Sequence, residues 1–154
     1  MRTDADSLGF LIADVARLLR RRFERALDKA GLGLTPGEAR TLAHAGRHGQ
    51  VRQSALAESM CVEPMTLVGY LDRLEAAGLV KRLPDPDDRR AKLVSLTPRA
   101  RPVLDRIAAV GRAVRESATG GLDAGDVEVL RNALLRMRAE LAGEEPQDTA
   151  GEAA

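Results

Sequence analysis

A charged turn at residues 84–90, with the sequence PDPDDRR, holds the side chains best suited to bind an ion or a polar partner. Its carboxylates, Asp85, Asp87 and Asp88, could be imagined as a magnesium site, but the two prolines and paired arginines around them indicate a surface turn. Arg89 and Arg90 place cations at the tip, and Asp88 would orient a guanidinium through a charge-assisted hydrogen bond. No nucleophile–base pair or phosphate-cradling glycine loop appears elsewhere, so no residue is assigned a catalytic role and no enzyme is expected.

A second group of side chains shares one face of a helix predicted from Pro64 to about Ala77. Pro64 suits a first helical position, and Gly78 suits the left-handed residue that ends a helix. The spacing of Leu67, Leu71 and Leu74 predicts one buried stripe. The opposite face carries Met65, Thr66, Gly69, Asp72 and Arg73. A helix that buries its leucines and exposes such a mixed face is typical of a major-groove reader.

The neighbouring elements complete a winged helix-turn-helix. Residues 53–60 form the first helix of the motif, and segments 79–83 and 91–96 form a β-hairpin around the charged turn. The fold class is therefore mainly α with a small β-hairpin. The residues expected to contact double-stranded DNA are Gln53, Ser54, Pro64, Met65, Thr66, Gly69, Arg73, Asp88, Arg89 and Arg90.

Four fragments in this region, in their order and spacing, resemble the MarR (multiple antibiotic resistance regulator) family. They are Leu-Ala at 56–57, LDRLEAAGLV at 71–80, DPDDRR at 85–90 and Leu-Thr at 96–97. The run Asp-Arg-Arg-Ala-Lys, followed by Leu-Thr and Arg-Ala-Arg-Pro, is especially similar to the SlyA branch. The resemblance implies a DNA-binding transcriptional regulator that acts as a homodimer, and it favours a repressor.

Amphipathic helices flank the winged region. Thr35-Pro36-Gly37-Glu38 predicts a capping box before a helix to about Ala45, Thr97-Pro98 is expected to cap a long helix, and Asp123 to cap the last one. The resulting organisation is one domain over 1–143, with the reading region at about 34–98 and dimerisation helices at about 7–31 and 98–143. Residues 144–154 are acidic and are expected to be disordered.

A dimer of this kind would read two half-sites about 34 Å apart in a near-palindromic site. Backbone amides near Pro64 and Met65 would meet phosphate, Thr66 would donate to a base or phosphate, and Met65 would touch a thymine methyl group. Arg73 would position the helix, while the two wing arginines would enter an A·T-rich minor groove. Gly69 stands where the SlyA branch often has arginine, which predicts modest base specificity.

The family resemblance also implies release from DNA when a small phenolic or anionic effector enters a pocket beside the dimer helices. The candidate lining residues are Leu11, Val15, Arg22, Ala43 and His44. Ala39 and Ala43 replace the aromatic and histidine side chains of the SlyA-branch pocket, which predicts a larger or less selective cavity. His44 and His48 lie four residues apart, but no third ligand is near them, so no metal or other cofactor is expected.

Composition is consistent with a regulator. Residues 1–122 hold 21 Lys and Arg against 15 Asp and Glu, a balance of +6, which suits phosphate neutralisation. One cysteine, Cys61, excludes an internal disulfide and is expected in the core. The chain shows no signal peptide and no membrane span, so a cytoplasmic location without a membrane partner is expected. The alternatives are a winged-helix protein-interaction module and a redox sensor without a ligand pocket.

Overall fold

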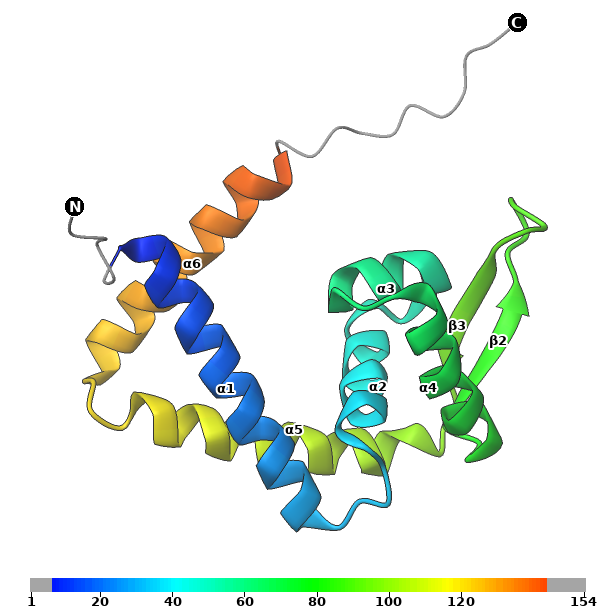
Figure 1. The fold of residues 1–154 in the computed structure, drawn as a ribbon, viewed down its shortest axis with the longest axis horizontal. Coiled ribbons are helices and arrows are strands. Elements are labelled where there is room, and N and C mark those ends of the chain that lie inside the picture. The colour runs from blue at the N-terminus through cyan, green and yellow to red at the C-terminus, as the bar shows by residue number, and fades with distance from the viewer. Residues whose placement is uncertain (1–6, 144–154) are drawn as a thin grey trace, which may run out of the picture. The chain divides into compact units, whose positions relative to one another are not determined.

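The computed structural model describes residues 7–143 of the 154-residue chain. The predicted acidic tail at 144–154 lies outside the described residues. The chain divides into two compact units, one ending at Arg115 and one beginning at Glu116. The elements are α1 (Leu8–Ala30), α2 (Pro36–His48), β1 (Gln50–Arg52), α3 (Gln53–Met60), α4 (Pro64–Ala76), β2 (Val80–Pro84), β3 (Lys92–Leu96), α5 (Ala100–Thr119) and α6 (Ala124–Gly143) (Figure 1).

The core of the first unit is formed where α2, α3 and α4 meet the sheet. Leu67, Leu71 and Leu74 are fully buried, which confirms the stripe predicted for the reading helix. Leu56 and Met60 of α3 are also buried, as the sequence predicted. These two helices therefore hold a fixed position under the wing, because close-packed side chains transmit any displacement between them.

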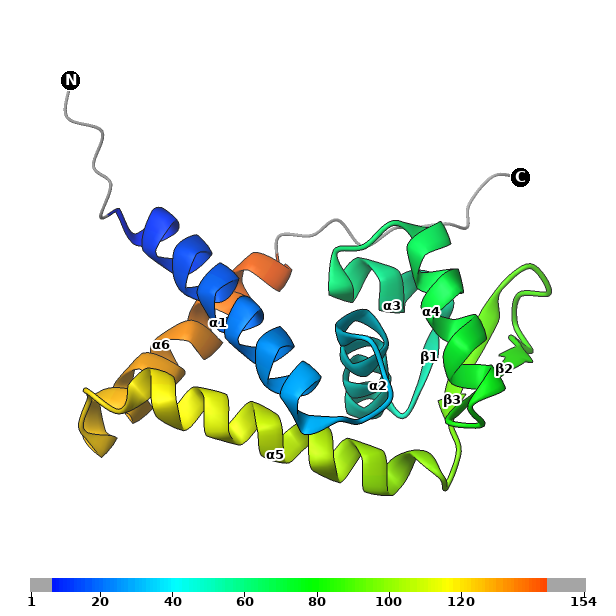
Figure 2. The ribbon, with the colours of Figure 1, turned by 60° about the horizontal axis from the view of Figure 1, so that its bottom comes forward.

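The sheet has three antiparallel strands in the order β1–β3–β2. In β2 and β3, Val80 lies opposite Leu96 and Pro84 opposite Lys92, which confirms the predicted hairpin to within a residue or two. Strand β1, whose Val51 lies opposite Val94, was not predicted. Three residues are too few to show an alternating pattern. The hairpin projects beyond α4 and ends in the charged turn (Figure 2).

Helix α2 begins as predicted and ends later than predicted. The Thr35 hydroxyl accepts from the Glu38 amide at 3.3 Å, and the Glu38 carboxylate accepts from the Thr35 amide at 3.1 Å, which confirms the capping box. The helix continues past Ala45 to His48, because Gly46 packs against a neighbouring helix and does not end α2. A Cβ at Gly46 would lie 3.3 Å from Leu104 of α5, so glycine lets the two helices approach closely.

The expected cap at Thr97 is wrong, while that at Asp123 is confirmed. The Thr97 hydroxyl donates to the Gly78 carbonyl at 2.6 Å, so it ties the end of α4 to the start of α5. Helix α5 begins at Ala100, whose amide binds the Thr97 backbone carbonyl at 3.0 Å. In the second unit, the Asp123 carboxylate accepts from the Asp126 amide at 2.8 Å at the start of α6.

Cys61 is exposed, which contradicts its predicted place in the core. It occupies the position that ends α3 and has a left-handed backbone conformation, with φ of 51°. Its amide donates to the Glu58 carbonyl at 2.9 Å. The turn to α4 directs this residue outward, whereas its neighbour Met60 is 2% exposed. The apolar character of cysteine was therefore a poor guide to burial in a turn.

Two helices each expose several large apolar side chains. On α1 these are Leu8, Phe10, Leu11, Val15 and Leu18. On α6 they are Val129, Leu130, Leu134, Leu135 and Leu141, and this helix has no buried residue. Among residues 7–143, no helix combines the length and apolar character that a membrane crossing would need.

Candidate nucleic-acid interface

A concavity of about 360 Å³ lies where the first turns of α3 and α4 meet the wing. Its lining residues are Gln53, Ser54, Pro64, Leu67, Asp88, Arg90, Ala91 and Lys92. Five residues predicted to contact DNA are thus brought together although they lie up to 37 positions apart, from Gln53 to Arg90. The other three lining residues, Leu67, Ala91 and Lys92, were not among the predicted contacts. Lys92 adds a second cation to that of Arg90.

Two helix N-termini open onto this concavity. Helix α3 begins after Arg52 and helix α4 after Glu63, and neither preceding residue caps its helix through a side chain. The first amides of each helix consequently lack a side-chain acceptor and retain their partial positive charge. Amides of this kind, beside the cations of Arg90 and Lys92, form a good site for phosphate oxygens.

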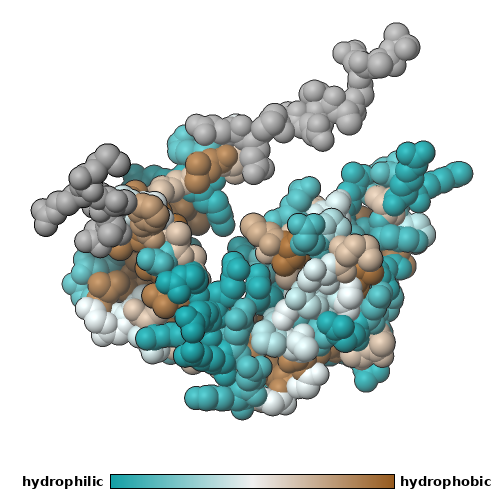
Figure 3. Space-filling model, viewed as in Figure 1, coloured by the Kyte–Doolittle hydropathy of each residue, from teal (hydrophilic) through white to brown (hydrophobic). Residues whose placement is uncertain are grey.

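Arg89 and Arg90 are exposed at the wing tip, which is hydrophilic in Figure 3. The sequence predicted that Asp88 would orient one of these guanidiniums, and this prediction is wrong. Its carboxylate accepts from the Arg90 amide at 2.9 Å, and its carbonyl accepts from the Ala91 amide at 2.9 Å. A short acidic side chain readily binds the backbone two residues onward. Asp88 therefore shapes the turn and leaves both guanidiniums directed to solvent.

Asp85 anchors the base of the wing. Its carboxylate accepts from the Asp87 amide at 2.9 Å and from Arg52 Nε at 2.6 Å. The Asp87 amide, followed by the Arg52 guanidinium, lowers the pKa of Asp85 despite the opposing effect of burial. Within residues 7–143 no cluster of three or more His, Cys, Asp or Glu side chains suits a metal ion.

The outward face of α4 is open in its first half. Met65 is 78% exposed, Thr66 is exposed, and a Cβ at Gly69 would meet no atom within 4 Å. A side chain at position 69 would therefore extend freely from the helix. Arg73, one turn further on, has an intramolecular partner instead: its Nε is paired with the Glu38 carboxylate of α2.

The Glu38–Arg73 pair joins the reading helix to α2. Glu38 is 5% exposed, and burial alone would raise its pKa. The Arg73 guanidinium and the Thr35 groups overcome that effect, so the pKa of Glu38 is lowered. The Arg73 guanidinium also lies 5.8 Å from the centroid of the Tyr70 ring. A Cβ at Gly37 would come within 2.6 Å of the Tyr70 hydroxyl oxygen, so only glycine leaves room for this ring.

A third link joins the wing to the reading helix through Arg82 of β2. Its Nη2 lies 2.7 Å from Asp72 and 2.6 Å from Glu75, and its backbone amide donates to Glu75 at 2.9 Å. These bonds lower the pKa of Glu75 and raise that of Arg82. Sequence reasoning missed the Glu75–Arg82 and Glu38–Arg73 ion pairs, because pairs seven and 35 residues apart leave no local signal.

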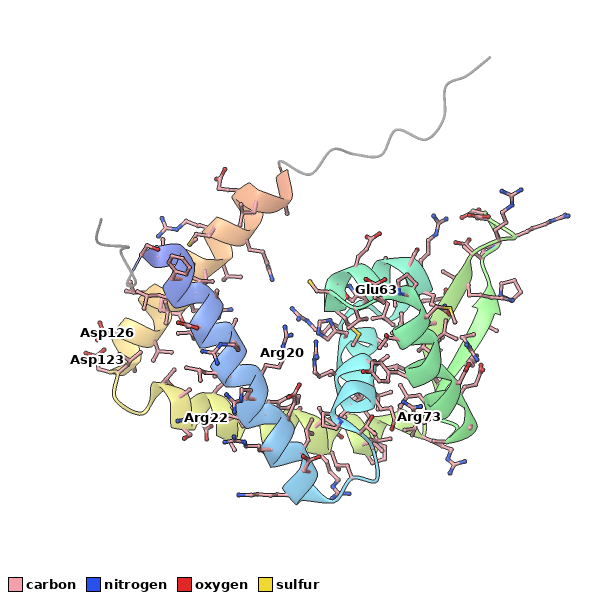
Figure 4. All side chains as sticks on the ribbon, in the orientation of Figure 1. Arg20, Arg22, Glu63, Arg73, Asp123 and Asp126 are labelled. Atoms are coloured by element: carbon pink, nitrogen blue, oxygen red, sulfur yellow. The ribbon has the colours of Figure 1, made fainter. Side chains whose placement is uncertain are left out.

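A separate cavity of about 420 Å³ lies between α1, α2 and α5. It is lined by Leu19, Arg20, Phe23, Arg40, Ala43, His44, Arg47, Ile107, Ala108, Gly111, Val114 and Arg115. Two of these residues, Ala43 and His44, are among those that the sequence predicts for an effector pocket. Leu11 and Val15 do not line it, since they lie on earlier turns of α1. Nor does Arg22: the cavity takes Arg20, which is about 200° away around the helix (Figure 4).

His44 stands at the wall of this cavity, with its Nδ1 3.4 Å from the Ser59 hydroxyl of α3. Burial lowers its pKa, and the charges of Arg47, Arg40, His48 and Arg20 lower it further. His44 is therefore neutral over a wider pH range than an exposed histidine.

Comparison with known proteins agrees with this architecture. The sequence model of the MarR family matches residues 34–92. The HTH-type transcriptional repressor NicR of Pseudomonas putida is 32% identical over 131 residues, which cover 80% of this chain and 81% of NicR.

Solved structures show the same similarity. A MarR-family transcriptional regulator from Rhodococcus sp. RHA1 has a TM-score of 0.75 and 29% identity, covering 89% of this chain and 96% of its own. CouR from Rhodococcus jostii RHA1, solved bound to p-coumaroyl-CoA, has a TM-score of 0.70 and 27% identity, covering 89% of this chain and 95% of its own. Members of the matched family are transcriptional regulators and not enzymes. The chain thus belongs to the MarR family of transcriptional regulators.

Proposed function

We propose that this chain represses transcription as a homodimer bound to a near-palindromic site in double-stranded DNA. In each subunit α4 enters the major groove and the wing reaches the neighbouring minor groove. The observation that carries the proposal is the concavity in which two uncapped helix N-termini lie beside Arg90 and Lys92. A phosphate seated there would fix the register of α4 over the bases, because backbone contacts position a reading helix and base contacts give it specificity.

Base reading in this proposal is modest. Met65 and Thr66 are exposed on the outward face of α4, where they would reach a thymine methyl group and a base or phosphate. Gly69 offers no hydrogen bond at the centre of that face, and Arg73 is held by Glu38. Much of the discrimination then falls to Arg89 and Arg90, which would recognise a narrow A·T-rich minor groove by its potential.

The homodimer is formed by α1, α5 and α6 in this proposal. What supports it is the apolar surface that α1 and α6 leave exposed, including Phe10 at 56% and Val129 at 70%. Large apolar side chains exposed in groups on a helix are typical of protein interfaces. The reading region at about 34–98 and the flanking dimerisation helices would then act as one domain over 1–143. A DNA-binding regulator acts in the compartment that holds its DNA, and the proposed location is the cytoplasm.

Regulation by a small effector is the second part of the proposal. The cavity volume of about 420 Å³ falls within the range typical of small-molecule sites. Helix α2 forms part of the cavity wall and also holds Glu38, the partner of Arg73. A ligand that displaced α2 would thereby shift the reading helix. CouR was solved with p-coumaroyl-CoA bound, and by analogy an organic acid or its thioester is a suitable class of effector here.

Sequencing the DNA that co-purifies with the protein from its own cells tests this function. We expect short enriched fragments that share a near-palindrome whose half-sites are about one helical turn apart. Size-exclusion chromatography with light scattering should give twice the chain mass. A monomer, or co-purified DNA without a shared site, would refute the proposal and favour a winged-helix module that binds protein.

A further inference from the structure

We propose that the cavity between α1, α2 and α5 binds an amphipathic polyanion, a compound with an apolar arm and two or more negative charges. A phosphorylated or diphosphorylated lipid-like or aromatic compound has this chemistry, whereas a simple phenolic acid carries a single charge. The inference rests on the proposed effector function of the same cavity and specifies the ligand class.

The space for an apolar arm arises from small side chains. Ala43, Ala108 and Gly111 face the cavity from α2 and α5, and larger residues there would fill it. The remaining apolar wall consists of Leu19, Phe23, Ile107 and Val114. A Cβ at Gly111 would lie 3.7 Å from the Phe23 ring and 3.2 Å from Arg115 Nη1, so the glycine keeps this part of the wall thin.

The charges around this apolar space all have one sign. Four arginines line it from three helices, Arg20 from α1, Arg40 and Arg47 from α2, and Arg115 from α5. Its described lining includes no aspartate or glutamate. The Glu24 carboxylate, which is outside the lining, lies 4.0 Å from Arg40, and the Arg40 side chain is only 18% exposed. Neither Arg20 nor Arg47 forms an ion pair with any carboxylate in the described part of the chain.

This arrangement favours a multiply charged ligand. Like charges gathered around one cavity repel one another, and bound anions relieve that repulsion. One carboxylate would pair with Arg20 or with Arg47 and leave the other of these two without a counter-charge. A phosphate or diphosphate presents several oxygens, and guanidinium groups bind such oxygens in pairs. The low pKa of His44 fits the same picture, since burial and four neighbouring cationic groups disfavour a further positive charge.

A ladder of ligands with one shared arm tests the inference. Octanoate, octyl phosphate and octyl diphosphate increase in charge at mildly alkaline pH, and inorganic diphosphate supplies charge without an arm. Isothermal titration calorimetry on the full chain should show affinity rising at least about tenfold from octanoate to octyl diphosphate. Inorganic diphosphate should bind more weakly than octyl diphosphate. Equal affinity along the series, tighter binding of octanoate, or no binding of any probe at millimolar concentration would overturn the inference.

Single variants then locate the site. Arg20→Ala and Arg47→Ala should each weaken octyl diphosphate binding by about tenfold and leave octanoate binding within about twofold. The matched control is Arg21→Ala, because Arg21 is exposed on α1 and does not line the cavity. An equal effect of Arg21→Ala would show nonspecific attraction and contradict the site. DNA binding measured on the same samples separates the two claims. Intact DNA binding without the charge ladder defeats only this inference, whereas loss of DNA binding by the wild type defeats the proposed function.

Discussion

Arg73 of the reading helix is ion-paired with the buried Glu38 of α2, so the helix proposed to read bases is fixed to the helix that forms one wall of the cavity. Glu38 lies in the first turn of α2, and Arg40, Ala43, His44 and Arg47 line the cavity along the following turns. The pair therefore connects the reading helix directly to the helix that lines the cavity.

Removing this pair should destabilise the fold and loosen α4. We expect Arg73→Ala to lower the free energy of unfolding by roughly 1–2 kcal/mol, because it leaves Glu38 buried without its cation while Arg73 itself is more than half exposed. Urea denaturation measures this change. Arg73→Lys should recover part of it. If Arg73→Ala left both stability and DNA affinity unchanged, the pair would have no positioning role.

Acid should weaken the links within the reading region. The pKa values of Glu38 and Glu75 are lowered from the ordinary 4.5 by their arginine partners. A depressed pKa in the folded state stabilises the protein fully above the unfolded value. That contribution is lost as the pH falls below about 4.5 through the folded pKa values. Denaturation midpoints across this range should fall less steeply in the Glu38→Gln, Glu75→Gln double variant, and an identical slope would contradict the assignment.

Gly69 should be replaceable without a steric penalty. Its Cβ position is open within 4 Å, and glycine inside a helix costs about 1 kcal/mol relative to alanine. Gly69→Ala should therefore raise the free energy of unfolding by up to about 1 kcal/mol. Gly69→Arg should sharpen the preferred DNA sequence, because a bidentate base contact is worth about 1–3 kcal/mol of discrimination. If a binding-site selection gave the same consensus for the wild type and for Gly69→Arg, position 69 would not face the bases of the major groove.

Cys61 should react readily in the folded protein and tolerate glycine. It is exposed and has φ of 51°, a conformation that glycine adopts without strain. We expect Cys61→Gly to leave stability unchanged or slightly higher, and Cys61→Val to lower it by about 1 kcal/mol or more. Mass spectrometry after a brief exposure to iodoacetamide under native conditions should show one modified site. Protection from the reagent until unfolding would restore the core position predicted from sequence.

The elements with local signals were predictable from the sequence. The capping box at Thr35, the leucine stripe of α4 and the glycine at position 78 each depend on residues a few positions apart, and each appears as expected. The ion pairs of Asp85 with Arg52 and of Glu38 with Arg73 depend on tertiary packing, so no periodic pattern in the sequence reveals them. Three of the five residues predicted for the effector pocket, Leu11, Val15 and Arg22, do not line the cavity for a related reason. Periodicity identifies the apolar face of α1, but only the position of α2 shows that Arg20 and not Arg22 meets the cavity.

Placement in the SlyA branch stays a prediction, because the matched sequence model identifies the MarR family as a whole. The homodimer and the DNA contacts are likewise proposals, which the following measurement tests. Arg90→Ala and Arg101→Ala form a matched pair for that purpose. Both residues are exposed arginines, but only Arg90 lines the concavity, whereas Arg101 lies 3.7 Å from Asp105 on α5.

Fluorescence anisotropy with the enriched duplex, titrated over a series of salt concentrations, tests the phosphate-binding concavity most directly. We predict that the association constant of the wild type falls steeply with salt, and that Arg90→Ala weakens binding and reduces the log–log slope by about one per subunit. Arg101→Ala should match the wild type. A salt-independent association constant, or equal slopes for wild type and Arg90→Ala, would contradict the account.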